Sequence, residues 1–280
     1  MTKNVDMRKL TTYKLKGIVK EVLHPKDILE LIELLKELKD KKYMVLGNGS
    51  NVVFLNDYDG TVIKLDNFNM LSIEDNIVTV GAGYSIIKLA LETAKLGLSG
   101  LEFASGIPGT VGGCIYGNAG AYNKDIASII KEVTILDDSL KIRTLNPKQM
   151  SFAYRKSILQ NNNYICLSAV FELKHKDKKE ILDLIKNRRK RRQETQPLNK
   201  PSAGSVFRNP DGDHAGRIIE SLGYKGKSIG GAMVSEKHAN FIINHKNASG
   251  KDILALVNMV KKEVKDKYNI DLITEQEFID

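Results

Sequence analysis

The chain has 280 residues, of which 42% are hydrophobic and 28% are charged, and its formal net charge is +9. This length predicts two or three domains that share an interface, and the composition is typical of a soluble globular protein. Because no run of 18 apolar residues occurs and the first residues lack the apolar core of a signal peptide, we expect a cytoplasmic protein without a membrane partner. Cys114 and Cys166 are too few for a disulfide framework and lack metal-binding spacing, so we expect buried free thiols and no metal site.

The first predicted elements are a helix and a short strand. Asp27 followed by Glu30 is a capping-box pattern, and apolar residues recur at helical spacing from there to Leu38. A buried strand at 43–46 runs into the glycine-rich turn 47–51. Short strands follow at 62–65 and 77–80, and a second helix begins near Ser85 and ends at Gly97 as its C-cap.

The segment from Gly97 to Gly120 is the most unusual part of the chain, because it holds eight of the 22 glycines in 24 residues. Such backbone can lie against a large flat ligand or present N–H groups to phosphate without obstruction by a Cβ. The turn 47–51 has the same chemistry, although its residues alone fit an ordinary hairpin loop equally well. A Rossmann fingerprint is disfavoured because Val52 or Ile86 replaces its third glycine, and a P-loop because Ser221 replaces its first.

The second half of the chain predicts more sheet, a basic helix and a small third unit. Its expected elements are a hairpin at 133–136 and 141–145, a strand at 165–171, helices at 215–222 and from Ser249, and strands at 241–243 and 270–279. The run from Lys186 to Arg192 carries six positive charges at the end of a helical pattern. Because no aromatic residues alternate with these charges, we expect a solvated linker helix that attracts anionic substrates, and no nucleic-acid partner.

Several motifs, in the same order along the chain, resemble those of UDP-N-acetylenolpyruvoylglucosamine reductase (MurB), from about residue 12 to the C-terminus. They are Gly47-Asn48-Gly49-Ser50-Asn51, Ser105-Gly106-Ile107-Pro108-Gly109-Thr110-Val111-Gly112-Gly113, Asn118-Ala119-Gly120-Ala121, Tyr154-Arg155-Lys156-Ser157, Pro201-Ser202-Ala203-Gly204-Ser205-Val206-Phe207 and Val234-Ser235-Glu236-Lys237-His238-Ala239. The resemblance implies an α+β fold, in which an FAD-binding domain of the vanillyl-alcohol oxidase/p-cresol methylhydroxylase type precedes a small α+β substrate domain. We expect FAD-binding subdomains at 1–70 and 71–180 and a C-terminal domain with its linker helix at 181–280.

The resemblance also implies the cofactor and the reaction. NADPH would reduce a noncovalently held FAD, and a hydride would then reach the enolpyruvyl group of a UDP-sugar, giving UDP-N-acetylmuramate for peptidoglycan synthesis. We expect the protein to act as a monomer. The residues expected to bind FAD are Gly47, Asn48, Gly49, Ser50, Asn51, Ser105, Gly106, Gly109, Thr110, Gly112, Gly113, Asn118, Gly120 and Ala121.

Three polar residues fall on the family's catalytic positions, namely Arg155, Ser205 and Glu275. Read alone, they fit a surface arginine, a small turn residue and an exposed carboxylate. In the family's reaction, the arginine and the glutamate would stabilise charge on the substrate carboxylate, and the serine would deliver a proton. Arg155 and Asn209 match substrate-side positions.

The chain departs from the family pattern at two places and leaves some roles open. Glu277 stands where the family usually has arginine, and Thr195 stands where it commonly has lysine. Lys225, Lys237 and His238 could touch the diphosphate or only shape the domain. The compact C-terminal part indicates the shorter of the family's two subclasses. The alternatives are another flavoenzyme, such as an alcohol or sugar oxidase, and a nucleotide-binding or nucleic-acid-binding module that uses the basic run.

Overall fold

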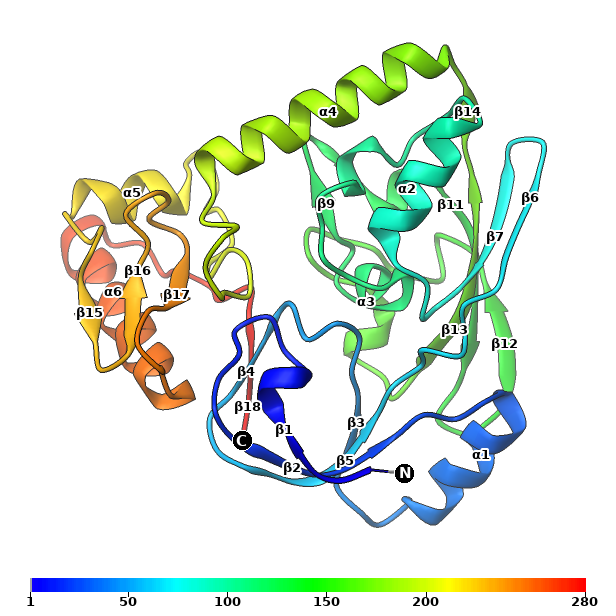
Figure 1. Ribbon diagram of the computed structural model, residues 1–280, viewed down its shortest axis with the longest axis horizontal. Coiled ribbons are helices and arrows are strands. Elements are labelled where there is room, and N and C mark those ends of the chain that lie inside the picture. The colour runs from blue at the N-terminus through cyan, green and yellow to red at the C-terminus, as the bar shows by residue number, and fades with distance from the viewer. Residues whose placement is uncertain (1) are drawn as a thin grey trace. The chain divides into compact units, whose positions relative to one another are not determined.

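The computed structural model describes residues 2–280 and contains both helices and strands throughout (Figure 1). The chain forms two compact units. Unit 1 comprises residues 23–48 and 62–191, and unit 2 comprises residues 2–22, 49–61 and 192–280. Unit 2 therefore combines the C-terminal part of the chain with two N-terminal segments.

Unit 1 is built on a five-stranded antiparallel sheet of order β12-β11-β13-β7-β6. Its central strand β13 is nearly continuous in apolar residues, and Ala169 pairs with Val133 on one side and Val80 on the other. The strands are β6 (Leu71–Glu74), β7 (Ile77–Gly81), β11 (Ile130–Leu136), β12 (Ile142–Leu145) and β13 (Ile165–Glu172). The prediction of a sheet-rich region that contains a hairpin is confirmed.

The helices of unit 1 begin where the sequence places capping residues. The Asp27 carboxylate accepts a hydrogen bond from Glu30 N, and the Ser85 hydroxyl accepts one from Lys88 N. Gly97 has φ +74°, the left-handed conformation expected after a helix end. These helices are α1 (Ile28–Glu37), α2 (Ile86–Lys95), the short α3 (Val111–Tyr116), which packs against β13, and the basic α4 (Lys178–Thr195), which continues into unit 2.

Unit 1 also contains short strands in its connecting segments. They are β3 (Tyr43–Val45), β8 (Leu98–Ser99) paired with β14 (Lys174–His175), and β9 (Gly120–Ala121) paired with β10 (Lys124–Asp125). The β5 strand (Tyr58–Ile63) has its last two residues in unit 1 and its first four in unit 2.

Unit 2 packs helix α6 (Gly250–Tyr268) against a three-stranded antiparallel sheet of order β15-β16-β17. The predicted start of α6 is confirmed, because Ser249 and Asp252 form a reciprocal capping box. The other elements are β1 (Thr2–Asp6), β2 (Ile18–Leu23), β4 (Val52–Phe54), α5 (Ala215–Ser221), β15 (Ser228–Ile229), β16 (Ala232–Val234), β17 (Ile242–Asn244) and β18 (Glu277–Ile279).

The last predicted strand is shorter than expected. Only 277–279 form a regular ladder, parallel to β4, whereas 270–273 lie outside any strand, Thr274 makes a single bridge to Phe207, and residues 275–276 form a bend. This segment is fixed by separate hydrogen bonds, such as the one from Glu275 N to Val206 O at 2.8 Å. It therefore follows the Ser205 loop without forming a continuous sheet with it.

Candidate active site

The turn 47–51, between β3 and β4, offers a row of unused backbone donors. Among residues 2–280, none of the N–H groups of these five residues donates a hydrogen bond to the protein. Gly49 has φ +59°, and a Cβ added there would lie 2.2 Å from the Leu10 carbonyl oxygen. Consecutive unpaired N–H groups at a left-handed glycine form a concave anion site, so the turn fits the diphosphate of a dinucleotide cofactor.

A buried lysine that the sequence analysis missed supports this turn. Lys64 Nζ donates a hydrogen bond to the Gly47 carbonyl oxygen, and its side chain is only 11% exposed. Burial lowers the pKa of this ammonium group, and Asp66 at 4.0 Å partly opposes that shift. The sequence feature that could have identified Lys64 is its position inside the predicted strand 62–65, where a charged residue is unusual.

The second glycine-rich segment lies against this turn within unit 1. Asn48 Nδ2 donates to the Pro108 carbonyl oxygen at 3.4 Å, and a Cβ on Gly47 would lie 2.9 Å from Thr110 Oγ1. Thr110 caps α3 by accepting a hydrogen bond from Gly113 N. The structure therefore brings together two predicted cofactor segments that are 60 residues apart in the sequence.

Several glycines of the second segment are required by protein packing. A Cβ on Gly112 would lie 3.0 Å from Ala82 Cβ, and one on Gly120 would lie 2.6 Å from the Lys124 carbonyl oxygen. A Cβ on Gly109 would lie 3.0 Å from Cys114 Sγ. Gly113 is different, because it is exposed and Thr110 Oγ1 at 3.3 Å is its only near neighbour. Only Gly113 of these four thus leaves open space for a ligand.

Other predicted cofactor residues have their side chains engaged inside unit 1. The buried Ser105 hydroxyl donates to the Glu102 carbonyl oxygen at 2.9 Å. The buried Asn118 amide makes three hydrogen bonds to protein groups. Gly106 and Ala121 are partly exposed. Contact of these residues with FAD stays a prediction.

Arg155 lies beside the predicted cofactor segment of unit 1. It sits in a tight turn with φ +58°, and its Nη2 donates to the Gly120 carbonyl oxygen at 2.8 Å. The guanidinium group also stacks over the Tyr154 ring, 5.0 Å from its centre. The half-buried cation is thus held by its surroundings, as a group that recognises a substrate carboxylate requires.

Unit 2 brings Ser205 close to Glu275 and to the cofactor turn. Val206, next to Ser205, accepts a hydrogen bond from Glu275 N at 2.8 Å, and Asn51 Nδ2 donates to the Glu275 carbonyl oxygen at 3.0 Å. The half-buried Ser205 hydroxyl has no hydrogen-bond partner among the described residues, so it remains available to a ligand.

Gln276 is a second supporting residue that the sequence analysis missed. It is 2% exposed, accepts a hydrogen bond from the Tyr13 hydroxyl at 3.3 Å, and donates to the carbonyls of Ala203 and Gly204 at 3.0 and 3.2 Å. Gln276 thereby fixes the loop that carries Ser205. A glutamine in the last segment gave no sequence signal, because its partners are 73 and 263 residues away.

The remaining substrate-side candidates have partners within unit 2. Asn209 Oδ1 accepts a hydrogen bond from Ala215 N at 3.1 Å, which leaves its amide N–H groups for a substrate. Lys225 pairs with Glu220 at 2.6 Å, and Lys237 Nζ donates to the Gln193 carbonyl oxygen. His238 Nδ1 accepts from Asn240 N at 3.2 Å, and burial lowers the pKa of the imidazole. One ring nitrogen of His238 is therefore engaged within unit 2.

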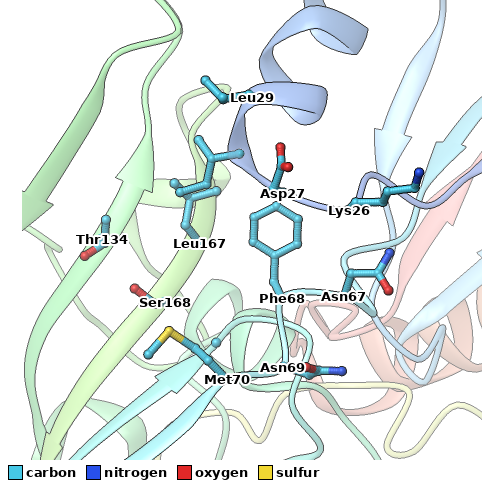
Figure 2. Close-up of a pocket in the computed structure, with 12 residues that line it drawn as sticks. Lys26, Asp27, Leu29, Asn67, Phe68, Asn69, Met70, Thr134, Leu167 and Ser168 are labelled. Atoms are coloured by element: carbon cyan, nitrogen blue, oxygen red, sulfur yellow. The ribbon is translucent and has the colours of Figure 1, made fainter.

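One cavity of about 480 Å³ lies elsewhere in unit 1, and none of the predicted site residues lines it (Figure 2). Figure 2 shows Phe68 and Leu167 among its lining side chains. Its polar lining is partly used by the protein, because Asp27 caps α1 and Asn67 Nδ2 donates to the Pro25 carbonyl oxygen at 3.1 Å. Two of its polar lining side chains are thus already engaged by the protein.

Comparison with known proteins identifies the family. The chain is 45% identical over 274 residues to UDP-N-acetylenolpyruvoylglucosamine reductase of Bacillus licheniformis and 44% identical to that of Bacillus subtilis, covering 96% of this chain and 90% of each relative. The chain belongs to the UDP-N-acetylenolpyruvoylglucosamine reductase family. A solved reductase of this name (MurB) from Thermus caldophilus has a TM-score of 0.86 and 33% identity, covering 99% of this chain and 98% of that one.

Family models agree with this assignment. Residues 19–146 match the FAD binding domain, and residues 196–279 match the C-terminal domain of UDP-N-acetylenolpyruvoylglucosamine reductase. The predicted family, α+β class and FAD cofactor are confirmed. Among residues 2–280, no helix has the length and apolar character needed to cross a membrane.

Proposed function

We propose that this chain is an FAD-dependent UDP-N-acetylmuramate dehydrogenase, which uses NADPH to reduce the enolpyruvyl group of UDP-N-acetylglucosamine enolpyruvate for peptidoglycan synthesis. The observation that carries the proposal is the pair of hydrogen bonds at Glu275, from Asn51 Nδ2 to its carbonyl and from its N–H to Val206. They hold the cofactor turn, the glutamate and the Ser205 loop together. FAD, when bound, supplies hydride transfer.

Ser205 is the proposed proton donor. Its hydroxyl is half-buried and has no competing hydrogen bond within the described residues. Because a serine of ordinary pKa is a weak acid, it suits protonation of a strongly basic, carbanion-like carbon. Its position next to Val206, whose carbonyl and N–H are both fixed, restricts how far this hydroxyl can move.

Arg155 and Glu275 are proposed to stabilise the negative charge that develops on the substrate carboxylate. The Arg155 fork can donate two parallel hydrogen bonds to a carboxylate. Such donors accelerate a reaction when they are already oriented toward the place where charge develops. Glu275 would act as an acid or hydrogen-bond partner of the same group, and Asn209 would bind the substrate through its remaining amide N–H groups.

We further propose that the enzyme acts as a cytoplasmic monomer without a nucleic-acid or membrane partner. The exposed large apolar residues, such as Leu29, Ile142 and Leu198, lie on different segments, which does not favour a large apolar interface. Light scattering coupled to size-exclusion chromatography measures the molar mass in solution and so tests the monomeric state. If the protein lacked flavin and bound nucleic acid in a salt-sensitive way, the alternative function of a nucleic-acid-binding module would be favoured instead.

The proposed function is tested by measuring the two half-reactions, flavin reduction and flavin reoxidation, separately in the Ser205→Ala variant. We expect normal FAD content and normal bleaching of the flavin by NADPH, but reoxidation by the enolpyruvyl substrate slowed by roughly 10²–10⁴-fold. Ser202→Ala, a few residues earlier in the same loop, is the matched control and should keep both rates. Stopped-flow absorbance measures them. Equal damage to both steps would refute the assignment of Ser205, and failure of NADPH to bleach the wild type would favour an oxidase.

A further inference from the structure

Asn118 uses the whole hydrogen-bonding capacity of its amide N–H groups inside the protein. It follows α3, is 2% exposed and has φ +40°. Its Nδ2 donates to the Ala153 carbonyl oxygen at 3.0 Å and to Asp125 Oδ2 at 3.1 Å, and its Oδ1 accepts from Ala127 N at 3.1 Å. Because a side-chain amide has two N–H donors, neither is left for a bound cofactor.

The Ala153 carbonyl belongs to the turn that carries Arg155. Two hydrogen bonds close this turn, from Ala153 N to Lys156 O at 3.1 Å and from Lys156 N to Ala153 O at 3.0 Å. Asn118 therefore donates to the same carbonyl oxygen that closes the turn. In return, the Arg155 guanidinium of this turn donates a hydrogen bond to the Gly120 carbonyl oxygen, only two residues beyond Asn118. The segment 118–120 thus holds both the backbone and the side chain of the turn.

The backbone conformation of this region needs such support. Both Asn118 and Arg155 adopt left-handed φ angles, +40° and +58°. This conformation is unfavourable for residues with a Cβ, more so for arginine than for asparagine, and it persists where the surrounding structure holds it. Without the bond from Asn118, the turn can relax and move the guanidinium group.

We propose that Asn118 is a positioning residue, which anchors the 153–156 turn so that Arg155 is held in the orientation that binds the substrate carboxylate. This inference rests on the proposed function, which gives Arg155 its role. It changes the expectation for Asn118 from a side chain that contacts the flavin to one that acts through Arg155. A misplacement of about 1 Å in such a group can reduce the rate by on the order of 100-fold.

The primary variant is Asn118→Asp, which has nearly the same shape. It keeps an acceptor for Ala127 N but turns an oxygen toward the Ala153 carbonyl and the Asp125 carboxylate. Asn118→Gly is the second variant, because glycine accepts the left-handed φ and removes all three side-chain bonds. The matched control is Asn76→Asp, where Nδ2 donates to the Leu173 carbonyl oxygen at 2.9 Å in the same unit, away from the Arg155 turn.

Both Asn118 variants are expected to retain FAD and its reduction by NADPH, while substrate-driven reoxidation slows by roughly 10- to 100-fold. The control should keep both rates. Hydrogen–deuterium exchange provides a readout independent of activity, since the amides of Ala153 and Lys156 should exchange faster in the Asn118 variants. Loss of FAD from both variants would overturn the inference and make Asn118 a cofactor-binding residue.

A double-mutant cycle with Arg155→Ala decides whether Asn118 acts through the arginine. If it does, adding Asn118→Asp to Arg155→Ala should slow reoxidation by less than twofold more. Full additivity of the two effects would overturn the inference, as would a normal reoxidation rate in both Asn118 variants. A normal rate in Arg155→Ala would contradict both the role of Arg155 and this inference. By contrast, a wild-type enzyme that NADPH cannot reduce would mark failure of the proposed function itself.

Discussion

Gln276→Leu should destabilise unit 2 by about 1–8 kcal/mol. The substitution leaves three buried or partly buried groups without their partner, namely the Tyr13 hydroxyl and the carbonyls of Ala203 and Gly204. Each unsatisfied buried group costs about 1–3 kcal/mol. Burial of the added apolar surface of leucine offsets about 1–2 kcal/mol of that sum. The Tyr13 hydroxyl makes the largest contribution, because Tyr13 is fully buried.

Urea unfolding followed by circular dichroism measures this loss. With a slope of about 2 kcal/mol per molar urea, a loss in the middle of this range, about 4 kcal/mol, lowers the transition midpoint by about 2 M. Gln193→Leu is the control, because Gln193 is exposed on α4 and the same substitution there should change stability by less than about 0.5 kcal/mol. A loss below about 1 kcal/mol in Gln276→Leu would refute the reasoning, since it would mean that these groups find other partners at no cost.

Three further predictions concern single groups. Arg155→Lys should lower turnover more than apparent substrate affinity, because an ammonium group lacks the two-pronged geometry that matches the developing charge; a change in the Michaelis constant alone would contradict this. Burial raises the pKa of Cys114 and Cys166 to about 12, so neither thiol should react with a thiol reagent at pH 8 until the protein unfolds. Burial lowers the pKa of His238 below 6.5, so the unfolded chain binds the proton more readily than the folded one, and stability falls as pH drops below 6.5. His238→Gln should therefore reduce the loss of stability between pH 7.5 and 5.5, measured by urea titration. An unchanged loss would be evidence against this role of His238.

Local sequence signals predicted most of the regular elements. Ser85 and Ser249 were identified as helix starts, and the structure shows the hydroxyl of each accepting a hydrogen bond from the third residue of its helix. Short segments rich in apolar residues placed β7, β11 and β13 within a few residues of their observed ends. These signals work because caps and strands depend on residues that are close in the sequence.

Tertiary packing overrode the local signal in two places. Helix α3 contains Gly112 and Gly113, which are poor helix formers, and the sequence predicted no helix there. It forms a helix because Thr110 caps it and because its buried face packs against β13. In the C-terminal segment, apolar residues suggested one long strand, but no neighbouring strand pairs with residues 270–273.

In the candidate site, too, the sequence revealed local motifs but not long-range contacts. The motifs located the cofactor turn and Ser205, but the reasons for particular residues depend on distant partners. Gly49 is required by its left-handed φ of +59° and by the Leu10 carbonyl oxygen, which lies 2.2 Å from the position of an added Cβ. Lys64, Gln276 and the anchoring bond of Asn118 have partners 17 to 263 residues away, which no spacing rule connects.

The backbone at Glu275 links Asn51 of the turn to the Ser205 loop within unit 2. Its carbonyl accepts from Asn51, whose own carbonyl accepts from Glu277 N, so two hydrogen bonds fix the cofactor turn to the C-terminal segment. Its N–H donates to Val206, which fixes the same segment to the Ser205 loop. Any shift of the turn is therefore transmitted to Ser205 through backbone bonds that do not depend on the Glu275 carboxylate. It follows that the Asn51 side chain contributes to this arrangement by holding the Glu275 backbone in place.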